Sequence, residues 1–173
     1  GLQVVRAQQT SNGILWFGAP RPVESSTSYT DVLPSLNLNA ELGSGLQVRM
    51  GIAKTLARPN LEDMRAGFTA SVATSGATKG KWSGSGGKPD LEPWRATSYD
   101  LSLEKYFGKG SYVAVAGWYK QVATSIYIDD NPSYDFSGIP NNSGTPAISN
   151  LGTMSAPVNG QGGKIKGLEL SAT

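Results

Sequence analysis

The sequence predicts an all-β fold of about six antiparallel strands, of the kind that forms part of the wall of a transmembrane β-barrel. Three observations predict it. Apolar and polar residues alternate with a period of two, very short turns alternate with long polar connections, and the composition is rich in glycine but poor in charge. Glycine accounts for 22 of the 173 residues and charged residues for only 16%, which suits strands joined by polar turns better than long helices or a disordered tail.

A first hairpin is predicted between residues 32 and 53. Its apolar face comprises Val32, Leu36, Leu38, Ala40 and Leu42, and after the turn Leu46, Val48, Met50 and Ile52. The opposite parity holds Leu33, Ser35, Asn37, Asn39 and Glu41, and then Gln47, Arg49, Gly51 and Ala53. Folding the chain about Ser44 places Leu38 opposite Met50, and the polar Asn39 opposite Arg49. One turn length therefore satisfies both faces.

A second hairpin is predicted from a strand at 94–107, a tight turn at 108–110 and a returning strand at 111–123. In the first of these strands apolar Tyr99, Leu101 and Leu103 alternate with polar Ser98, Asp100, Ser102 and Glu104. In the returning strand both parities are apolar, so the sequence leaves its faces open. Partial strands at 2–9 and 164–173 bring the total to about six.

Three long polar connections, 11–30, 58–93 and 124–163, separate these strands. Long connections on one side and short turns on the other are typical of outer-membrane barrels, whose turns are periplasmic and whose loops are extracellular. Aromatic residues near strand ends favour interfacial girdles. They are Tyr29 and Trp94 on the long-loop side, and Tyr106, Phe107 and Tyr112 on the short-turn side.

The composition also excludes several classes of function. There is no cysteine and no histidine, so no disulfide, no cysteine-based metal site and no histidine general base can form. No carboxylate pair is placed in a way that indicates catalysis, and we expect neither an enzyme nor a cofactor. The acidic cluster at 129–131 lacks the spacing of a calcium loop, so no metal is expected. A net charge of +2 gives no reason to expect a nucleic-acid partner.

Five segments resemble strand motifs of TonB-dependent receptors, in the order that this family has them. They are 29–38 (YTDVLPSLNL), 54–61 (KTLARPNL), 89–104 (PDLEPWRATSYDLSLE), 118–120 (WYK) and 162–171 (GGKIKGLELS). Arg58 and Pro59 fall where a strand is expected to end, since proline cannot donate to a strand ladder. The following segment 59–64 could begin a short helix with proline in its first turn.

The resemblance implies a 22-stranded barrel in the bacterial outer membrane, with a plug domain inside it and energy delivered through TonB. Residues 1–173 are then expected to be a partial barrel, without the plug domain and without the end of the barrel. The implied function is active uptake of a small-molecule nutrient. The long form of the motifs is most similar to a subgroup associated with carbohydrate uptake.

Two alternatives remain open at this stage: a siderophore or metal-chelate receptor of the same class, and a soluble secreted β-domain that binds glycan or protein. The apolar face of the first hairpin distinguishes the second alternative. A soluble domain must bury that face within itself, whereas a barrel wall turns it toward outer-membrane lipid. In water alone, we expect the chain to associate through this face or through its edge strands.

Candidate ligand-binding residues lie in the long connections, where aromatic rings could stack on a sugar and polar groups could bind its hydroxyls. They are Trp82, Trp94, Arg95, Tyr127, Asp129, Asp130 and Tyr134. The polar face of the wall, which includes Asn37, Arg49 and Glu104, could contact the plug or line a substrate path. The simpler interpretation is a wet wall whose charges pair across strands.

Overall fold

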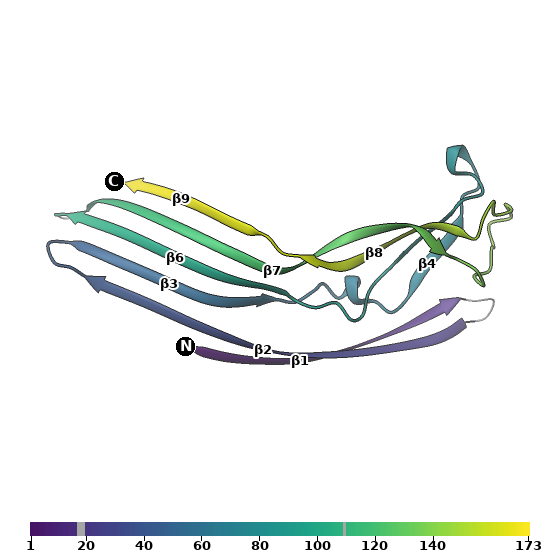
Figure 1. Cartoon of the computed structure of the whole chain (residues 1–173), viewed down its shortest axis with the longest axis horizontal. Coiled ribbons are helices and arrows are strands. Elements are labelled where there is room, and N and C mark those ends of the chain that lie inside the picture. Colours follow the sequence, from purple (N-terminus) through teal and green to yellow (C-terminus); the bar gives the residue numbers. More distant parts are fainter. Residues whose placement is uncertain (17–19, 109) are drawn as a thin grey trace.

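The computed structural model describes residues 1–16, 20–108 and 110–173, and within them it holds nine strands and two short 3-10 helices. The strands are β1 (Leu2–Trp16), β2 (Pro20–Glu41), β3 (Leu46–Ala57), β4 (Phe68–Val72), β5 (Trp82–Gly86), β6 (Trp94–Phe107), β7 (Ser111–Asp135), β8 (Leu151–Gln161) and β9 (Lys164–Ala172). The helices are η1 (Glu62–Met64) and η2 (Gly76–Thr78). Figure 1 shows them as one long, open and curved sheet, not a closed body. The predicted all-β fold is confirmed.

The sheet has the order β1-β2-β3-β6-β7-β8-β5-β4, and β9 also pairs with β7. β8 pairs with the stretch 124–135 of β7 and β9 with the stretch 113–121. β8 and β9 are therefore two halves of one kinked strand that follows β7 along its length (Figure 1). Counted in this way, the wall consists of β1, β2, β3, β6, β7 and the β8–β9 strand, as the sequence predicts. β4 and β5 are additions to it.

The first hairpin has the predicted register. Leu38 pairs with Met50 and Asn39 with Arg49. The turn is closed by hydrogen bonds from the amide of Leu42 to the carbonyl of Leu46 at 2.9 Å, and from the amide of Leu46 to the carbonyl of Gly43 at 2.9 Å. Ser44 has φ 52° between two glycines that also have positive φ, which is why this three-residue turn is so rich in glycine.

The second hairpin supplies the faces of β7 that the sequence leaves open. Leu101 pairs with Gly117 and Asp100 with Trp118. Directly paired residues share a face, so Val113, Val115, Gly117 and Tyr119 lie on the apolar side. The residues that lie on the polar side are Ala114, Ala116, Trp118 and Lys120.

The three long connections are not simply loops, and this part of the prediction is wrong. Segment 11–30 belongs to the β1–β2 hairpin, whose register runs from Leu2 opposite Pro34 to Trp16 opposite Pro20; residues 17–19 lie outside the described part. Segment 58–93 contains β4 and β5, and segment 124–163 contains the second half of β7 and all of β8. Beyond the membrane both faces of a strand meet water, so these strands have no apolar alternation to reveal them.

The hydrophobic core is small and lies at the end of the sheet opposite the short turns. Its central cluster consists of Val72 on β4, Trp82 on β5, Phe136 directly after β7, and Met154 on β8. The rings of Trp82 and Phe136 stack with centroids 5.3 Å apart. β5 joins β8 in parallel, so this cluster fastens the 58–93 segment to the wall.

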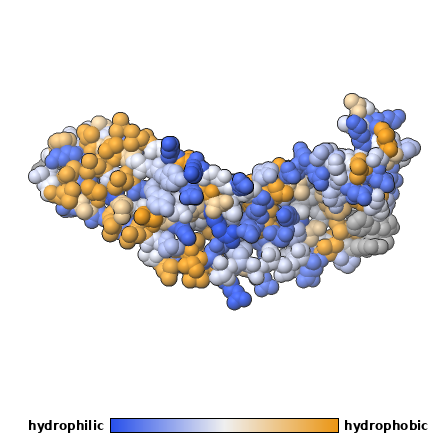
Figure 2. Space-filling model, in the orientation of Figure 1, coloured by the Kyte–Doolittle hydropathy of each residue, from blue (hydrophilic) through white to orange (hydrophobic). Residues whose placement is uncertain are grey.

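The apolar face of the wall is not buried. Leu38 is 52% exposed, Leu101 56% and Leu170 77%. Figure 2 shows apolar residues gathered over the half of the sheet that carries the short turns and polar residues over the other half. A soluble domain would have covered this stripe, so the exposed face indicates a wall that meets lipid. Within the described residues, no helix is long and apolar enough to cross a membrane.

Most of the strand-end aromatic residues that were predicted to form girdles lie on the polar face of the sheet, not on the lipid face. Tyr106 pairs with Tyr112 on the polar face, and its hydroxyl donates to Glu104 Oε2 at 2.7 Å. Because side chains alternate between faces, residues one position apart differ in side. Phe107 is therefore on the apolar face, as are Tyr99 and Tyr119, whose ring centroids lie 6.0 Å apart.

Candidate functional site

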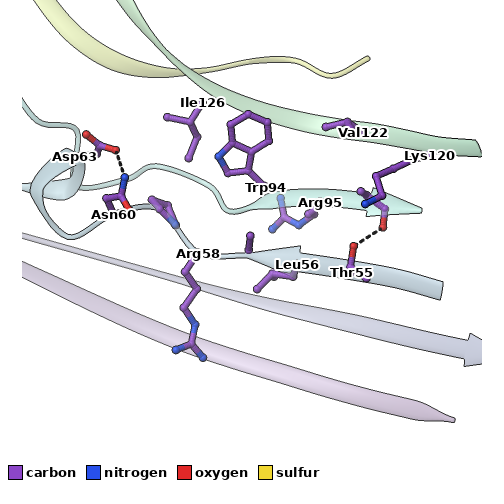
Figure 3. Close-up of a pocket in the computed structure, with 13 residues that line it drawn as sticks. Thr55, Leu56, Arg58, Asn60, Asp63, Trp94, Arg95, Lys120, Val122 and Ile126 are labelled. Carbon is purple, nitrogen blue, oxygen red and sulfur yellow. Dashed lines mark hydrogen bonds between the residues drawn. The ribbon is translucent and has the colours of Figure 1, made fainter. Parts of the chain in front are cut away.

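A cleft of about 600 Å³ opens where β3, β6 and β7 leave the apolar part of the wall. Figure 3 shows the side chains that line it. Its lining is Thr55, Leu56, Ala57, Arg58, Pro59, Asn60, Asp63, Trp94, Arg95, Ala96, Lys120, Val122 and Ile126. Trp94 pairs with Ala57 and Ala96 with Thr55, both of the same parity as Arg49, so most of this lining belongs to the polar face of the sheet.

One rim of the cleft is built by the end of β3. The strand stops at Ala57, just before Arg58 and the buried Pro59, as the missing proline amide predicts. The chain then forms η1, so the predicted short helix exists as a single 3-10 turn at Glu62–Met64. Asn60 Nδ2 donates to Asp63 Oδ2 at 3.4 Å, which holds an amide and a carboxylate together at this rim.

Arg95 fixes the floor of the cleft by a forked ion pair. Its Nε donates to Asp31 Oδ1 at 2.7 Å and its Nη2 to Asp31 Oδ2 at 3.1 Å. Its Nη1 donates to Glu92 Oε2 at 2.6 Å. The carboxylates of Asp31 and Glu92 together neutralise the guanidinium. The guanidinium stays charged and ties β2 to β6.

A β-bulge shapes the same place. The pairing of β6 with β7 shifts between Arg95 and Ala96. The Thr124 hydroxyl fills the irregularity: it accepts from the Arg95 amide at 3.0 Å and donates to the Pro93 carbonyl at 2.7 Å. Bulges bend a strand and re-aim its side chains, and this one separates the polar wall from the segment beyond it.

The structure brings only Trp94 and Arg95, of the seven predicted ligand residues, into this cleft. Trp94 is 40% exposed. In Figure 3 its ring lies close to Ile126. Both residues therefore remain candidates for ligand contact.

Trp82 and Tyr134 lie in or beside the hydrophobic core. Trp82 is 4% exposed, and its ring face is occupied by Phe136. Tyr134 packs at 4.9 Å from Phe136 and 6.5 Å from Phe68, measured between ring centroids. These contacts give both residues a packing role, which the sequence could not distinguish from a ligand role because the surrounding strands carry no alternation.

Tyr127, Asp129 and Asp130 lie on β7 beyond the bulge and are exposed. Alternation places Tyr127 and Asp129 on one face and Asp130 on the other. The Ser155 hydroxyl donates to Asp130 Oδ1. These three residues do not form one site with Trp94. Within the described residues, no group of three or more carboxylates is close enough to hold a metal ion.

Sequence reasoning missed the other polar residues of the cleft, among them Asn60, Asp63 and Lys120. For Asn60 and Lys120 the available signal was the resemblance itself, because 54–61 and 118–120 are two of the matched motifs; Asp63 lies outside these motifs. Nearer the short turns, the polar face carries paired charges, as the simpler interpretation predicts: Arg49 Nε lies 3.4 Å from Glu104 Oε1 across β3 and β6.

Comparison with known proteins gives the family. The family described as "TonB dependent receptor-like, beta-barrel" matches residues 2–173. No curated protein matches the chain. A mutant of the ferric enterobactin receptor PfeA from Pseudomonas aeruginosa is similar in structure, with a TM-score of 0.62, 17% identity and 94% of this chain covered.

A second mutant of that receptor, in complex with enterobactin, is similar with a TM-score of 0.63, 18% identity and 86% of this chain covered. In both comparisons the chain spans 21% of the length of the receptor. At this identity the likeness shows the fold alone, whereas the family match covers almost every residue. The chain belongs to the β-barrel family of TonB-dependent receptors of the bacterial outer membrane.

Proposed function

We propose that the chain forms part of an active transporter that takes up a small-molecule nutrient across the outer membrane, with energy delivered through TonB. The observation that carries this proposal is the two-faced wall. One face is apolar and unburied, and the other is polar and opens into the cleft at Trp94. A wall of this kind separates lipid from an aqueous path. It also argues against a soluble secreted β-domain, which would have no use for an exposed apolar stripe.

We propose a carbohydrate as the substrate class. The cleft combines the half-exposed ring of Trp94 with amide, carboxylate and ammonium groups of Asn60, Asp63 and Lys120. Sugar sites combine an apolar ring face with polar groups in this way. Arg95 is already neutralised by Asp31 and Glu92, so this residue offers little free positive charge to an anionic chelate; Arg58 and Lys120 are the other cations of the lining.

A siderophore is the second candidate, and a specific observation favours it. Both structures compared above are of one ferric enterobactin receptor, and one of them holds enterobactin. In either case the polar face, including Arg49 and Glu104, would contact the receptor's plug domain. Tyr127, Asp129 and Asp130 would meet the ligand earlier, at the outer rim.

Growth of a strain that lacks the full-length receptor tests the proposal. For a carbohydrate receptor, we expect slow growth on one sugar as sole carbon source and normal growth on iron chelates. A defect confined to iron-limited medium with one chelate would contradict the carbohydrate assignment and leave the transporter standing. Normal growth in every medium, together with no ligand binding by the purified receptor, would contradict transport.

The Trp94→Ala variant of the full-length receptor locates the contact. Loss of one aromatic stacking partner is expected to weaken ligand binding by about tenfold, measured by calorimetry with the sugar that the growth test identifies. Leu61→Ala is the matched control, since Leu61 is 86% exposed and does not line the cleft. Equal affinity of both variants would remove Trp94 from the site.

A further inference from the structure

The apolar face of the wall contains a groove of about 770 Å³ centred on Gly117. It is walled by the apolar and aromatic side chains Met50, Ile52, Tyr99, Leu101, Tyr119 and Leu168. The groove exists because Gly117 has no side chain: a Cβ placed there would meet only the Gly167 carbonyl oxygen, at 4.0 Å. The groove is thus open on the lipid side, and its lining is mostly apolar.

Positive charge lies at one end of this groove. Lys166 pairs with Tyr119 and lines the groove, and Lys164 pairs with Gln121 one step further from the short turns. Lys54 pairs with Thr97 in that same cross-strand row. All three lysines are exposed. Among the described residues of β3, β6, β9 and segment 111–121, none on this face is acidic.

We propose that this groove binds one phosphorylated, acylated lipid of the outer leaflet, of the chemistry of lipid A. An acyl chain would lie over Gly117, and a phosphate would meet the lysines at Lys164 and Lys166. The short turns define the periplasmic end, so these lysines lie toward the outer leaflet. Lysines at such a level reach the headgroup region, where they attract anionic lipid. The inference rests on the membrane face and is independent of the proposed substrate.

Charge complementarity distinguishes this occupant from others. A second copy of this chain, docked through its own apolar face, would bring no negative charge to the lysines. A lipid phosphate would neutralise them. A neutral lipid would fill the groove but gain nothing from the three cations. The combination of an apolar channel with cations at one end therefore selects an anionic amphiphile.

The test uses the purified full-length receptor in detergent, with hexa-acylated lipid A added and the retained lipid counted by native mass spectrometry. Wild type is expected to retain one lipid. The double variant Lys164→Gln with Lys166→Gln is expected to bind about 30-fold more weakly, since each charge lost near an anionic surface weakens binding roughly fivefold. Gly117→Leu fills the groove without a clash at Cβ and is expected to lose the lipid although its lysines remain.

Two controls keep the result specific. Lys79→Gln with Lys81→Gln removes two exposed lysines outside the wall strands, and Val113→Phe adds bulk to the apolar face outside the groove; both are expected to bind as wild type does. Equal retention by all variants would overturn the proposal, and so would equal retention of dephosphorylated lipid A or of phosphatidylglycerol. The lysine variants alter only exposed side chains, so a failure of Gly117→Leu to fold would still leave a decisive measurement.

Discussion

At the scale of single residues, the cleft depends on Arg95, whose side chain joins β6 to β2 and to Glu92. Arg95 stands at the start of β6, just before the bulge, and reaches Asp31 on β2 past the end of β3. Its side chain is 27% exposed and that of Asp31 15%. A forked guanidinium–carboxylate pair at this depth is stronger than a surface pair and demands the planar fork of arginine.

Replacing Asp31 by Asn should loosen the β1–β2 hairpin from β6. Because the guanidinium loses a charged partner, the expected cost is about 1–3 kcal/mol of local stability. Hydrogen exchange in the full-length receptor measures it as faster exchange of amides in residues 2–16 and 20–34. Glu62→Gln is the control, because Glu62 pairs with Arg65 but is 77% exposed, and its loss should cost less than about 1 kcal/mol. Equal exchange in the two variants would show that the Asp31 pair is no stronger than a surface pair.

Replacing Trp82 by Ala should open the small core without disturbing the wall. Truncation of a buried tryptophan costs about 3–5 kcal/mol, and the effect is expected in β4, β5 and β8 only. Limited proteolysis of the receptor in membranes should then cut within 68–86. The wall hairpins should stay intact, and Trp94→Ala should leave this region protected. Cleavage in both variants alike would contradict the assignment of Trp82 to the core.

At the scale of elements, the joint between β8 and β9 decides how the wall bends. Both strands pair with β7, and the Val122 amide donates to the Gly163 carbonyl between them at 2.8 Å. A Cβ at Gly162 would lie 1.7 Å from the Val122 carbonyl oxygen, while one at Gly163 would meet nothing within 4 Å. The first glycine is therefore required by close backbone approach, and the second is not.

Gly162→Ala should reduce the amount of folded receptor in the outer membrane severalfold, because the joint must move away from β7. Gly163→Ala, at the neighbouring position, should leave that amount unchanged. The heat-modifiable shift of barrel proteins in gel electrophoresis separates folded from unfolded receptor. The close approach would be disproved if the two variants folded equally well.

Elements were predictable from sequence only where lipid meets one face. Leu38, Met50 and Leu101 alternate with polar residues because the two faces of the wall meet different solvents, and this gave the hairpins and their register. Further from the turns, residues such as Ser11, Ser26 and Ser83 form strands that are polar on both sides. The faces of β7 stayed open because its polar side contains Ala114, Ala116 and Trp118. Within the cleft, only the strand end at Pro59 had a local physical signal.

At the scale of the whole molecule, the wall is asymmetric between its faces. Leu101 on one face and Ser171 on the other occupy adjacent regions of the same sheet. A charge on the first must enter lipid, whereas a charge on the second meets a polar surface. This asymmetry should control how each face tolerates substitution.

Leu101→Arg should destabilise the folded receptor by about 2–4 kcal/mol, as expected for a cation near the middle of the bilayer. Ser171→Arg should cost less than about 1 kcal/mol, because its face is polar. Urea unfolding of the receptor in lipid vesicles measures both. Equal destabilisation by the two variants would contradict the assignment of faces.

The 173-residue chain in water should not remain a monomer. Its leucines at 38, 101, 168 and 170 are between 52% and 77% exposed, and the strands at the edges of the sheet have unpaired backbone groups. Light scattering after gel filtration without detergent should show oligomers that mild detergent disperses. A monomer of constant mass in both conditions would contradict an uncovered apolar face.

The length of β7 has a consequence for how tightly a ligand can be held. Its 25 residues extend about 80 Å at roughly 3.3 Å per residue, which is far more than a tilted strand needs to cross the hydrocarbon layer. The segment beyond the membrane is therefore a ladder already ordered by β8. Binding a ligand there does not require a flexible loop to become ordered. The conformational entropy of ordering this segment is lost during folding, before any ligand binds.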